Sequence, residues 1–260
     1  MAEHDNPNPL VANFGAARRI FADIDTDDSD TAGKPASSGD EIPQLPGYDL
    51  HERLGGGATS DVYLAVREGH AKPLAVKILR APLRGHDDPR TQRAWRELQV
   101  LSQLRLPCLP RVIDFGEVDR RLFFVTEYVE GRTLTRHCDE RDLDLRGRVQ
   151  LLADVADAVH ALHERSIIHR DLKPSNIIIT PHGQPVIIDL GIASILAEDV
   201  MQTLTAEGAP IGSPAFMSPE QARGDRQRIS TRSDVYGLGA TAYVVLTGEP
   251  PFDPNATLHE

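Results

Sequence analysis

The spacing of apolar residues changes near the middle of this chain, and the change limits the folds that it can adopt. Three short apolar segments, 48–54, 62–66 and 74–79, are separated by glycine-rich or charged turns and predict β-strands, as do 111–116 and 122–127. Farther along, residues recur at spacings of four and three, the period of a core-facing helix: Leu145, Val149, Leu152, Ala156, Val159 and His163. We therefore expect an α+β fold of two lobes with a cleft between them, joined near residues 128–131.

Two further helices are predicted from local signals. Asp88 is a suitable N-cap and Pro89 suits the first helical position, so we expect a helix from there to about Leu104. The segment 233–246 is apolar around most of its circumference if it is helical. Such a helix belongs in a core and needs neighbours on more than one side.

Composition excludes several classes of protein. At 260 residues, 40% of them hydrophobic, the chain can bury one full core or two small ones. It has no apolar run near 18 residues and no signal-peptide pattern, so no membrane segment is predicted. The formal charge of −11 argues against a nucleic-acid-binding module, and the isolated Cys108 and Cys138 favour a reducing compartment. We expect a cytoplasmic protein, with a membrane-anchored longer form left open.

Residues 1–45 differ in composition from the rest of the chain. They contain clusters of Pro, Ser, Asp and Gly, and their nine acidic and three basic residues contribute −6 of the total charge of −11. Because no apolar period is sustained there, we predict a disordered acidic tail over 1–45 and a folded domain over 46–260. An apolar patch at residues 10–21 leaves open a short helix that docks elsewhere.

Two features of the first lobe are suited to binding phosphate. Three consecutive glycines, 55–57, lie between two predicted strands, where backbone amides can approach an anion because no Cβ intervenes. Lys77 lies in an apolar strand, where an ammonium group is costly to bury unless an anion meets it. Glu97, 20 residues farther along, is a candidate partner for Lys77. Each feature is weak alone, since ordinary hairpins use glycines and edge strands carry lysines.

The segment after the long predicted helix carries the strongest signal. Within Ile167–Asn176, the carboxylate of Asp171, the ammonium of Lys173 and the carboxamide of Asn176 occur close together. A second carboxylate, Asp189, follows a predicted hairpin. Phosphoryl transfer needs such a set, which provides metal ligands, a cation for the developing charge and a carboxylate that orients the attacking hydroxyl.

These residues resemble the motifs of eukaryotic-type (Hanks-type) serine/threonine protein kinases. His169–Asn176 resembles the catalytic loop, and Asp189-Leu190-Gly191 is similar to the DFG motif with leucine for phenylalanine. Met217–Glu220 resembles the APE motif, and Ser233–Gly239 resembles part of a long helix in the C-lobe. Ser60 in place of the third loop glycine and the run Ser-Pro-Glu-Gln-Ala-Arg are similar to bacterial members. The likeness extends from about residue 48 to the end of the chain.

The resemblance implies a fold and an activity. The protein-kinase-like fold would place an antiparallel sheet and one helix in the N-lobe (46–128), a hinge at 128–132, and a mainly helical C-lobe at 133–260. The implied reaction transfers the γ-phosphate of ATP to Ser and Thr hydroxyls of protein substrates, with Mg²⁺ as the metal and Mn²⁺ as an alternative.

Roles for individual residues follow from the same resemblance. Asp171 would be the catalytic base, Lys173 would neutralise the γ-phosphate, and Asn176 and Asp189 would hold the metal. Lys77 would bind the α- and β-phosphates, and Glu97 would orient it. Thr126 occupies the gatekeeper position. The implied ATP-binding residues are Leu54, Gly55, Gly57, Val62, Ala75, Lys77, Glu97, Glu127 and Val129.

The resemblance also implies regulation by phosphate. Arg170 precedes the catalytic aspartate, as in kinases whose activation segment is ordered by phosphorylation. Thr203 and Thr205 are the predicted phosphorylation sites, and phosphorylation of one copy of the chain by another is left open. The alternative is that both threonines are ordinary polar loop residues. Ser213 resembles a structural hydroxyl of the family.

The sequence departs from the family at its end. The family normally continues beyond the position of Glu260, so we expect an incomplete C-lobe, and we expect Glu220 to lack the arginine that the family pairs with it. A pseudokinase and a pure interaction module remain as alternatives, although the lysine and both aspartates of the motifs are intact. His160 and His163 have the spacing of a metal pair, but no third ligand is apparent.

Overall fold

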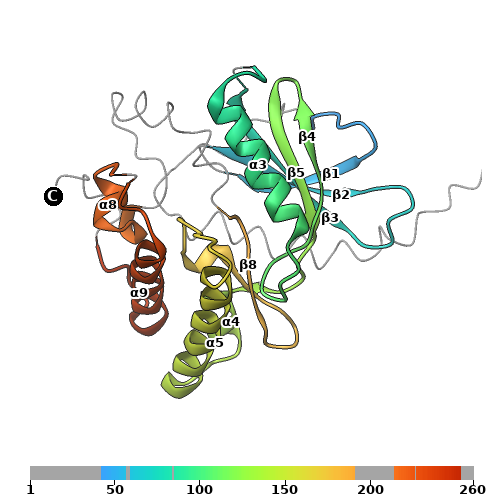
Figure 1. The fold of residues 1–260 in the computed structure, drawn as a ribbon. Coiled ribbons are helices and arrows are strands. Elements are labelled where there is room, and N and C mark those ends of the chain that lie inside the picture. Colours follow the sequence, from blue (N-terminus) through green and yellow to red (C-terminus); the bar gives the residue numbers. More distant parts are fainter. Residues whose placement is uncertain (1–41, 57–58, 84, 191–213, 226, 253–260) are drawn as a thin grey trace, which may run out of the picture.

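The fold consists of two sheets with helices around them (Figure 1). The computed structural model describes residues 42–56, 59–83, 85–190, 214–225 and 227–252. The predicted apolar patch at residues 10–21 lies outside them. Leu45, at the end of the predicted tail, is buried against the sheet and bridges to Tyr48, so it belongs to the folded part of the chain.

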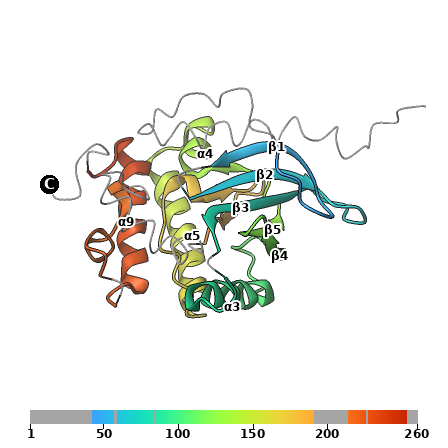
Figure 2. The same cartoon turned by 90° about the horizontal axis from the view of Figure 1, so that it is seen from above.

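The first sheet is antiparallel and has the strand order β1-β2-β3-β5-β4. Its strands are β1 (Asp49–Gly56), β2 (Ser60–Val66), β3 (Leu74–Pro82), β4 (Val112–Val118) and β5 (Arg121–Glu127). Helix α3 (Pro89–Gln103) packs on one face of this sheet through a shared apolar cluster that includes Ala94, Leu98 and Phe124 (Figure 2). The side chain of Asp88 accepts a hydrogen bond from Arg90 N (2.8 Å), as expected of an N-cap. The five predicted strands and the helix between them are confirmed.

The rest of the described chain is mainly helical and includes a small sheet. Its strands, in the order β6-β7-β8, are β6 (Arg132–Thr133), β7 (Ile177–Ile179) and β8 (Pro185–Ile187). The helices are α4 (Leu134–Glu140), α5 (Leu145–His163), α8 (Pro219–Ala222) and α9 (Thr231–Thr247), with 3₁₀ turns η2 (Pro174–Asn176) and η3 (Pro214–Phe216). Helices α5 and α9 lie side by side, and the apolar core of this lobe runs between α5 and the small sheet (Figure 2).

Helix α5 has the predicted period, but its buried face only partly matches the predicted one. Leu145 and Val149 are 68% and 51% exposed, although the pattern places them in the core. The buried residues are Leu151, Val155, Ala158, Val159 and Leu162; Val159 belongs to the predicted set, and Leu152 of that set packs partly buried against the core. Because this helix carries apolar residues on more than one side, its period alone does not select the face that packs. Packing against the neighbouring elements decides which face of α5 is buried.

The chain passes from the first sheet to the second over residues 128–131, and a glycine makes this passage possible. Gly131 lies so close to β7 that a Cβ on it would stand 2.4 Å from the carbonyl oxygen of Ile179 and 2.5 Å from Ile178 Cγ2. Real side chains do not approach a backbone atom so closely, so only glycine fits there without displacing β7.

Replacing Gly131 with alanine should therefore lower the free energy of unfolding by about 1–3 kcal/mol, the usual range for overpacking. The matched control is Gly239→Ala in α9, where an added Cβ meets nothing within 4 Å. Because alanine favours helix, that variant should gain up to about 1 kcal/mol. Denaturant titration of both variants gives the comparison, and equal stability of Gly131→Ala and the parent chain would contradict the packing argument.

Candidate functional site

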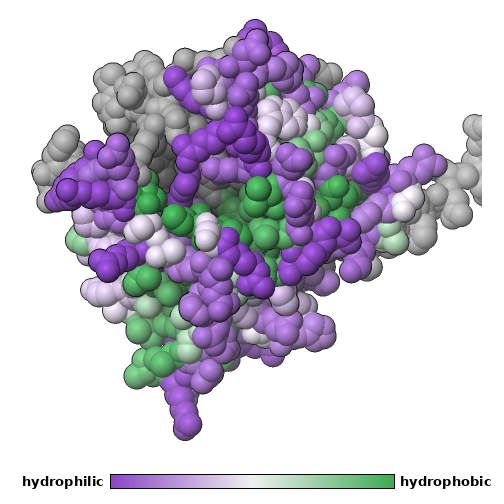
Figure 3. Space-filling model, viewed as in Figure 1, coloured by the Kyte–Doolittle hydropathy of each residue, from purple (hydrophilic) through white to green (hydrophobic). Residues whose placement is uncertain are grey.

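A cavity of about 190 Å³ lies between the two lobes. In the space-filling view, this face of the molecule is hollowed between the lobes, and apolar side chains gather in the hollow (Figure 3). Strands of the first sheet form one wall, and the segment 171–176 with the residues around β7 and β8 forms the other. The predicted site residues that line it are Gly55, Val62, Ala75, Lys77, Thr126, Glu127, Val129, Asp171, Lys173, Asn176 and Asp189.

The pairing of the strands explains the sheet wall of the cavity. Lys77 of β3 lies opposite Val62 of β2 and Phe124 of β5, and Ala75 lies opposite Thr126. Ala75 and Lys77 are two residues apart, so they face the same side of the strand. Leu54 does not line the cavity but is buried in a cluster with Leu64, and Gly57 lies outside the described residues.

A short ion pair crosses the cavity. Lys77 Nζ lies 2.7 Å from Asp189 Oδ1, and the Lys77 side chain is only 12% exposed. Burial raises the pKa of the Asp189 carboxyl, but the ammonium groups of Lys77 and, to a lesser extent, Lys173 outweigh burial and leave that pKa below its ordinary value. Asp189 therefore stays ionised at neutral pH. Its φ of 62° lies in the left-handed region, which marks local backbone strain.

Glu97 does not pair with Lys77, in contrast to the prediction. Glu97 Oε1 lies 3.3 Å from Arg93 Nε, one helical turn earlier on α3. Its side chain is 36% exposed, and it is absent from the lining of the cavity. Residues four apart on a helix surface are neighbours, so Arg93 is within reach of Glu97. The Lys77 ammonium pairs instead with the carboxylate of Asp189.

The segment after α5 orients its carboxylate through a side chain of its own. Asn176 Nδ2 donates to Asp171 Oδ2 (3.0 Å) and to the backbone oxygen of Asp171 (2.8 Å). Both hydrogen bonds use the amide nitrogen, so the amide oxygen of Asn176 remains available as a ligand. Asn176 itself is nearly buried in the turn η2, which limits its movement.

His169 joins this segment to the strand that precedes Asp189. Its Nε2 lies 2.8 Å from the carbonyl oxygen of Ile188, and its Nδ1 accepts a hydrogen bond from Asp171 N (3.2 Å). A carbonyl oxygen only accepts and a backbone N–H only donates, so one neutral tautomer, protonated on Nε2, satisfies both contacts. The ring thereby connects the backbone of Asp171 to that of Ile188, one residue before Asp189.

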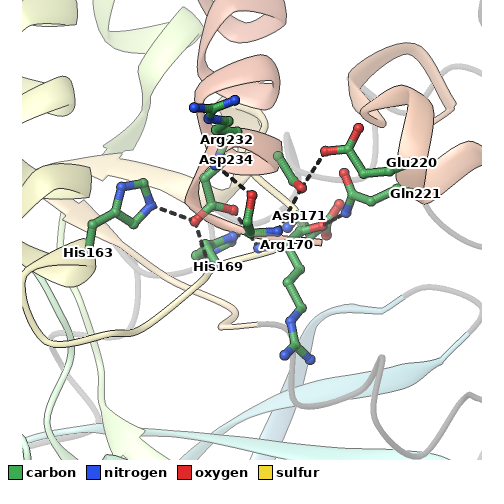
Figure 4. Close-up of polar contacts among 10 residues, drawn as sticks. His163, His169, Arg170, Asp171, Glu220, Gln221, Arg232 and Asp234 are labelled. Atoms are coloured by element: carbon green, nitrogen blue, oxygen red, sulfur yellow. Dashed lines mark hydrogen bonds and ion pairs between the residues drawn. The ribbon is translucent and has the colours of Figure 1, made fainter. Parts of the chain in front are cut away.

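A buried carboxylate on α9 anchors the same segment, and the sequence alone did not reveal it (Figure 4). Asp234 Oδ2 accepts from His169 N and lies 2.8 Å from His163 Nε2, while Oδ1 accepts from Arg170 N (2.8 Å). The Asp234 side chain is fully buried. His163, which the spacing paired with His160, is thus part of a hydrogen-bond network. The sequence feature that could have revealed this role is an aspartate within a mostly apolar helix, because a buried carboxylate needs hydrogen-bond donors.

A search for related sequences identifies the family. The model of the protein kinase domain family matches residues 48–260. This chain belongs to the protein kinase family. A relative, the serine/threonine-protein kinase PknB of Mycolicibacterium smegmatis, is 40% identical over 211 residues, covering 79% of this chain and 33% of that protein. The serine/threonine-protein kinase pkn2 of Myxococcus xanthus is 34% identical over 203 residues, covering 77% and 24%. The chain therefore spans about a third or less of the length of these relatives.

Solved structures, one of them a kinase domain, share the fold. The kinase domain of PknI from Mycobacterium tuberculosis superposes with a TM-score of 0.62 at 30% identity, covering 82% of this chain and 77% of that one. Rad53 residues 1–466, in complex with AMP-PNP, superposes with a TM-score of 0.63 at 27% identity, covering 82% and 52%. The predicted kinase-like α+β fold is confirmed. Among the residues that the structure describes, no helix is both long and apolar enough to cross a membrane.

The activation segment and the APE-like motif follow Asp189 in the chain. Thr203, Thr205 and Ser213 of the activation segment lie outside the described residues, so their predicted roles stay predictions. Glu220 of the APE-like motif accepts a hydrogen bond from Ser233 Oγ (2.5 Å), which lowers the pKa of its carboxyl. A hydroxyl group of α9 therefore contacts the Glu220 carboxylate, and the expectation that the arginine of the family is missing stays a prediction.

Replacing Asp234 with asparagine should destabilise this kinase domain. The amide keeps one oxygen but turns an NH₂ group toward backbone N–H donors, so at least one buried donor loses its acceptor. We expect a loss of about 1–3 kcal/mol in the free energy of unfolding. Asp157→Asn, on the exposed face of α5, is the control for the loss of a carboxylate. Matching denaturation curves for the two variants would show that Asp234 is not the anchor.

Proposed function

We propose that this chain is a serine/threonine protein kinase, which transfers the γ-phosphate of ATP to hydroxyl groups of protein substrates. The observation that carries the proposal is the convergence of Lys77, Asp171, Asn176 and Asp189 on one cavity between the lobes. These residues come from distant parts of the chain, and phosphoryl transfer requires all of their functional groups in one place. Membership of the protein kinase family supports the same reaction.

The residues of the cavity fit a nucleotide. Val62 and Ala75 supply apolar surface for the base, and residues 127–129 provide backbone groups at the hinge. Backbone amides near Gly55 and the Lys77 ammonium are suited to phosphates. The solved structure of Rad53 residues 1–466, which shares this fold, is a complex with AMP-PNP, and this supports the assignment of ATP.

The cavity also fits a divalent cation. Asn176 and the ionised Asp189 present oxygen ligands, the type that Mg²⁺ and Mn²⁺ prefer. A cation held by these two residues would neutralise negative charge on the phosphates. In our proposal Asp171 orients the hydroxyl of the substrate and takes up its proton, while Asn176 Nδ2 holds the Asp171 carboxylate at 3.0 Å. Lys173, on the same wall of the cavity, stabilises negative charge that develops on the transferred group.

The test is phosphate transfer from γ-labelled ATP to a general protein substrate in the presence of Mg²⁺. Lys77→Met, Asp171→Asn and Asp189→Asn should each lower kcat by orders of magnitude. Because the three groups act together, a variant that combines the substitutions should raise the activation free energy by far less than the sum of the three single effects. Substituting Mn²⁺ for Mg²⁺ in the same assay compares the two cations.

Matched controls separate chemistry from folding in this assay. Lys72→Met removes an exposed lysine five residues from Lys77, and Asp157→Asn removes an exposed carboxylate; both should keep the parent activity. If Asp171→Asn transfers phosphate at the parent rate, Asp171 is not the catalytic base. If the parent chain binds nucleotide but transfers nothing, the pseudokinase alternative holds.

We also propose that phosphate on Thr203 or Thr205 orders the activation segment through Arg170. Within the described part of the chain, the buried Nε of Arg170 has no hydrogen-bond partner, which supports an anionic partner. Mass spectrometry after ATP treatment should find the modification, and transfer between two copies of the chain predicts that its rate rises with protein concentration. Phosphatase treatment should then lower kcat. The hypothesis fails if the double variant Thr203→Ala/Thr205→Ala keeps the parent kcat.

We also propose a compartment and a domain boundary for this chain. Cys108 and Cys138 are both buried and free, which supports a cytoplasmic location because thiols stay reduced there. The burial of Leu45 supports a start of the kinase domain at or before that residue, with the acidic tail preceding it.

A further inference from the structure

The side chain of Gln221 connects α8 to the catalytic loop. Its Nε2 donates to the carbonyl oxygen of Arg170 at 2.6 Å. Its Oε1 accepts from Ser218 N (3.0 Å) and from Ser218 Oγ (2.9 Å). Because a carbonyl needs a donor and an N–H needs an acceptor, these partners fix which end of the amide points to the loop.

The turn that carries Gln221 is itself held in place. Ser218 is fully buried and caps α8, and the Ser218 and Gln221 side chains form a reciprocal capping box. Pro219 occupies the first helical position, where its fixed φ suits a helix. The next residue, Glu220, accepts from Ser233 Oγ of α9. Gln221 therefore approaches the loop from a short helix that is tied to α9 rather than from a mobile surface.

The group that Gln221 holds belongs to a strained residue. Arg170 has a φ of 72°, in the left-handed region that a residue with a side chain rarely adopts. Its N–H donates to Asp234 Oδ1 (2.8 Å), and its carbonyl accepts from Gln221 (2.6 Å). The two peptide groups that flank Arg170 are thus each held by a different helix, α9 on one side and α8 on the other (Figure 4).

The peptide group held by Gln221 is the one that leads into Asp171. A rotation of this peptide would release the Arg170 carbonyl, turn the Asp171 N–H away from His169 Nδ1, and move the Asp171 carboxylate with it. Hydrogen bonds that satisfy both ends of a strained residue are what keep such a conformation populated. The orientation of the catalytic carboxylate therefore depends on a side chain that lies 51 residues away from Arg170 in sequence.

We propose that Gln221 is a positioning residue for Asp171, which couples the order of the Ser218–Arg223 turn to the geometry of the catalytic loop. This inference rests on the proposed kinase function for its effect on rate, while its structural part stands separately. The coupling is specific, because the hydrogen bond to the Arg170 carbonyl comes from the amide nitrogen of Gln221 and needs a donor at that position. Losing that N–H should affect the chemical step more than the binding of nucleotide.

The variant Gln221→Glu tests the donor alone. Glutamate has the same shape and keeps oxygens that can accept from Ser218, but its ionised form has no hydrogen to donate to the Arg170 carbonyl. We expect kcat to fall about tenfold or more, the rate equivalent of a lost hydrogen bond, with the KM for ATP nearly unchanged. Gln221→Leu, which lacks both hydrogen-bonding groups, should show at least the same loss. Gln184→Glu, on an exposed turn, is the matched control and should keep the parent kcat.

The pH profile distinguishes positioning from a general loss of stability. In Gln221→Glu, the introduced carboxyl can donate to the Arg170 carbonyl once it is protonated, so the kcat of this variant relative to the parent chain should rise as the pH is lowered. The relative kcat of Gln221→Leu should stay low at every pH. A relative kcat of Gln221→Glu that is independent of pH, or a kcat equal to that of the parent chain, would overturn the proposal.

Hydrogen exchange tests the same inference without activity. In Gln221→Glu and Gln221→Leu the amide of Asp171 should exchange faster than in the parent chain, whereas Gln184→Glu should leave it unchanged. Unchanged exchange in both Gln221 variants would refute the positioning role. If the parent chain transfers no phosphate, the proposed function fails, yet the exchange measurement still decides whether Gln221 holds the loop.

Discussion

The buried carboxylate of Asp234 is the interaction on which the catalytic loop depends. Removing an ionised carboxylate from water is unfavourable unless donors replace its hydration, and three donors do so here. They are the backbone N–H groups of His169 and Arg170 and the ring of His163. Asp234 also lies in the first turn of α9, where the helix dipole favours a negative charge. Satisfying one charge therefore brings α5, α9 and the loop between them into a single arrangement.

From this anchor, a series of contacts leads to the groups that would react. Arg170 keeps its left-handed conformation because Asp234 and Gln221 hold the peptide groups on its two sides. The Asp171 carboxylate is then oriented by Asn176 from the same loop. From the opposite wall of the cavity, the ammonium of the mostly buried Lys77 pairs with the partly exposed Asp189, so the Lys77 charge does not lack a partner. The strain and the charges of this site are thus compensated by contacts from several different elements.

The parts of the molecule that could be predicted are those governed by neighbours in sequence. The strands, the cap at Asp88 and the gathering of Lys77, Asp171, Asn176 and Asp189 at one cavity follow from short motifs and their order. The buried face of α5 and the partner of Glu97 could not be predicted, because packing against other elements and competition between nearby charges decide them. Asp234 and Gln221 were missed for a similar reason, since their partner Arg170 lies 64 and 51 residues away.

The sequence by itself determined the family, the fold class and the residue types available for phosphoryl transfer, because these depend on local sequence patterns that can be recognised without a structure. Tertiary structure alone decided which groups hold those residues in place. A buried carboxylate or amide takes whichever donors and acceptors the folded chain brings within about 3 Å, and hydrogen bonds act only at that range. Whether Lys77 meets Asp189 or Glu97, and whether Gln221 reaches Arg170, is therefore settled by how the helices and sheets pack.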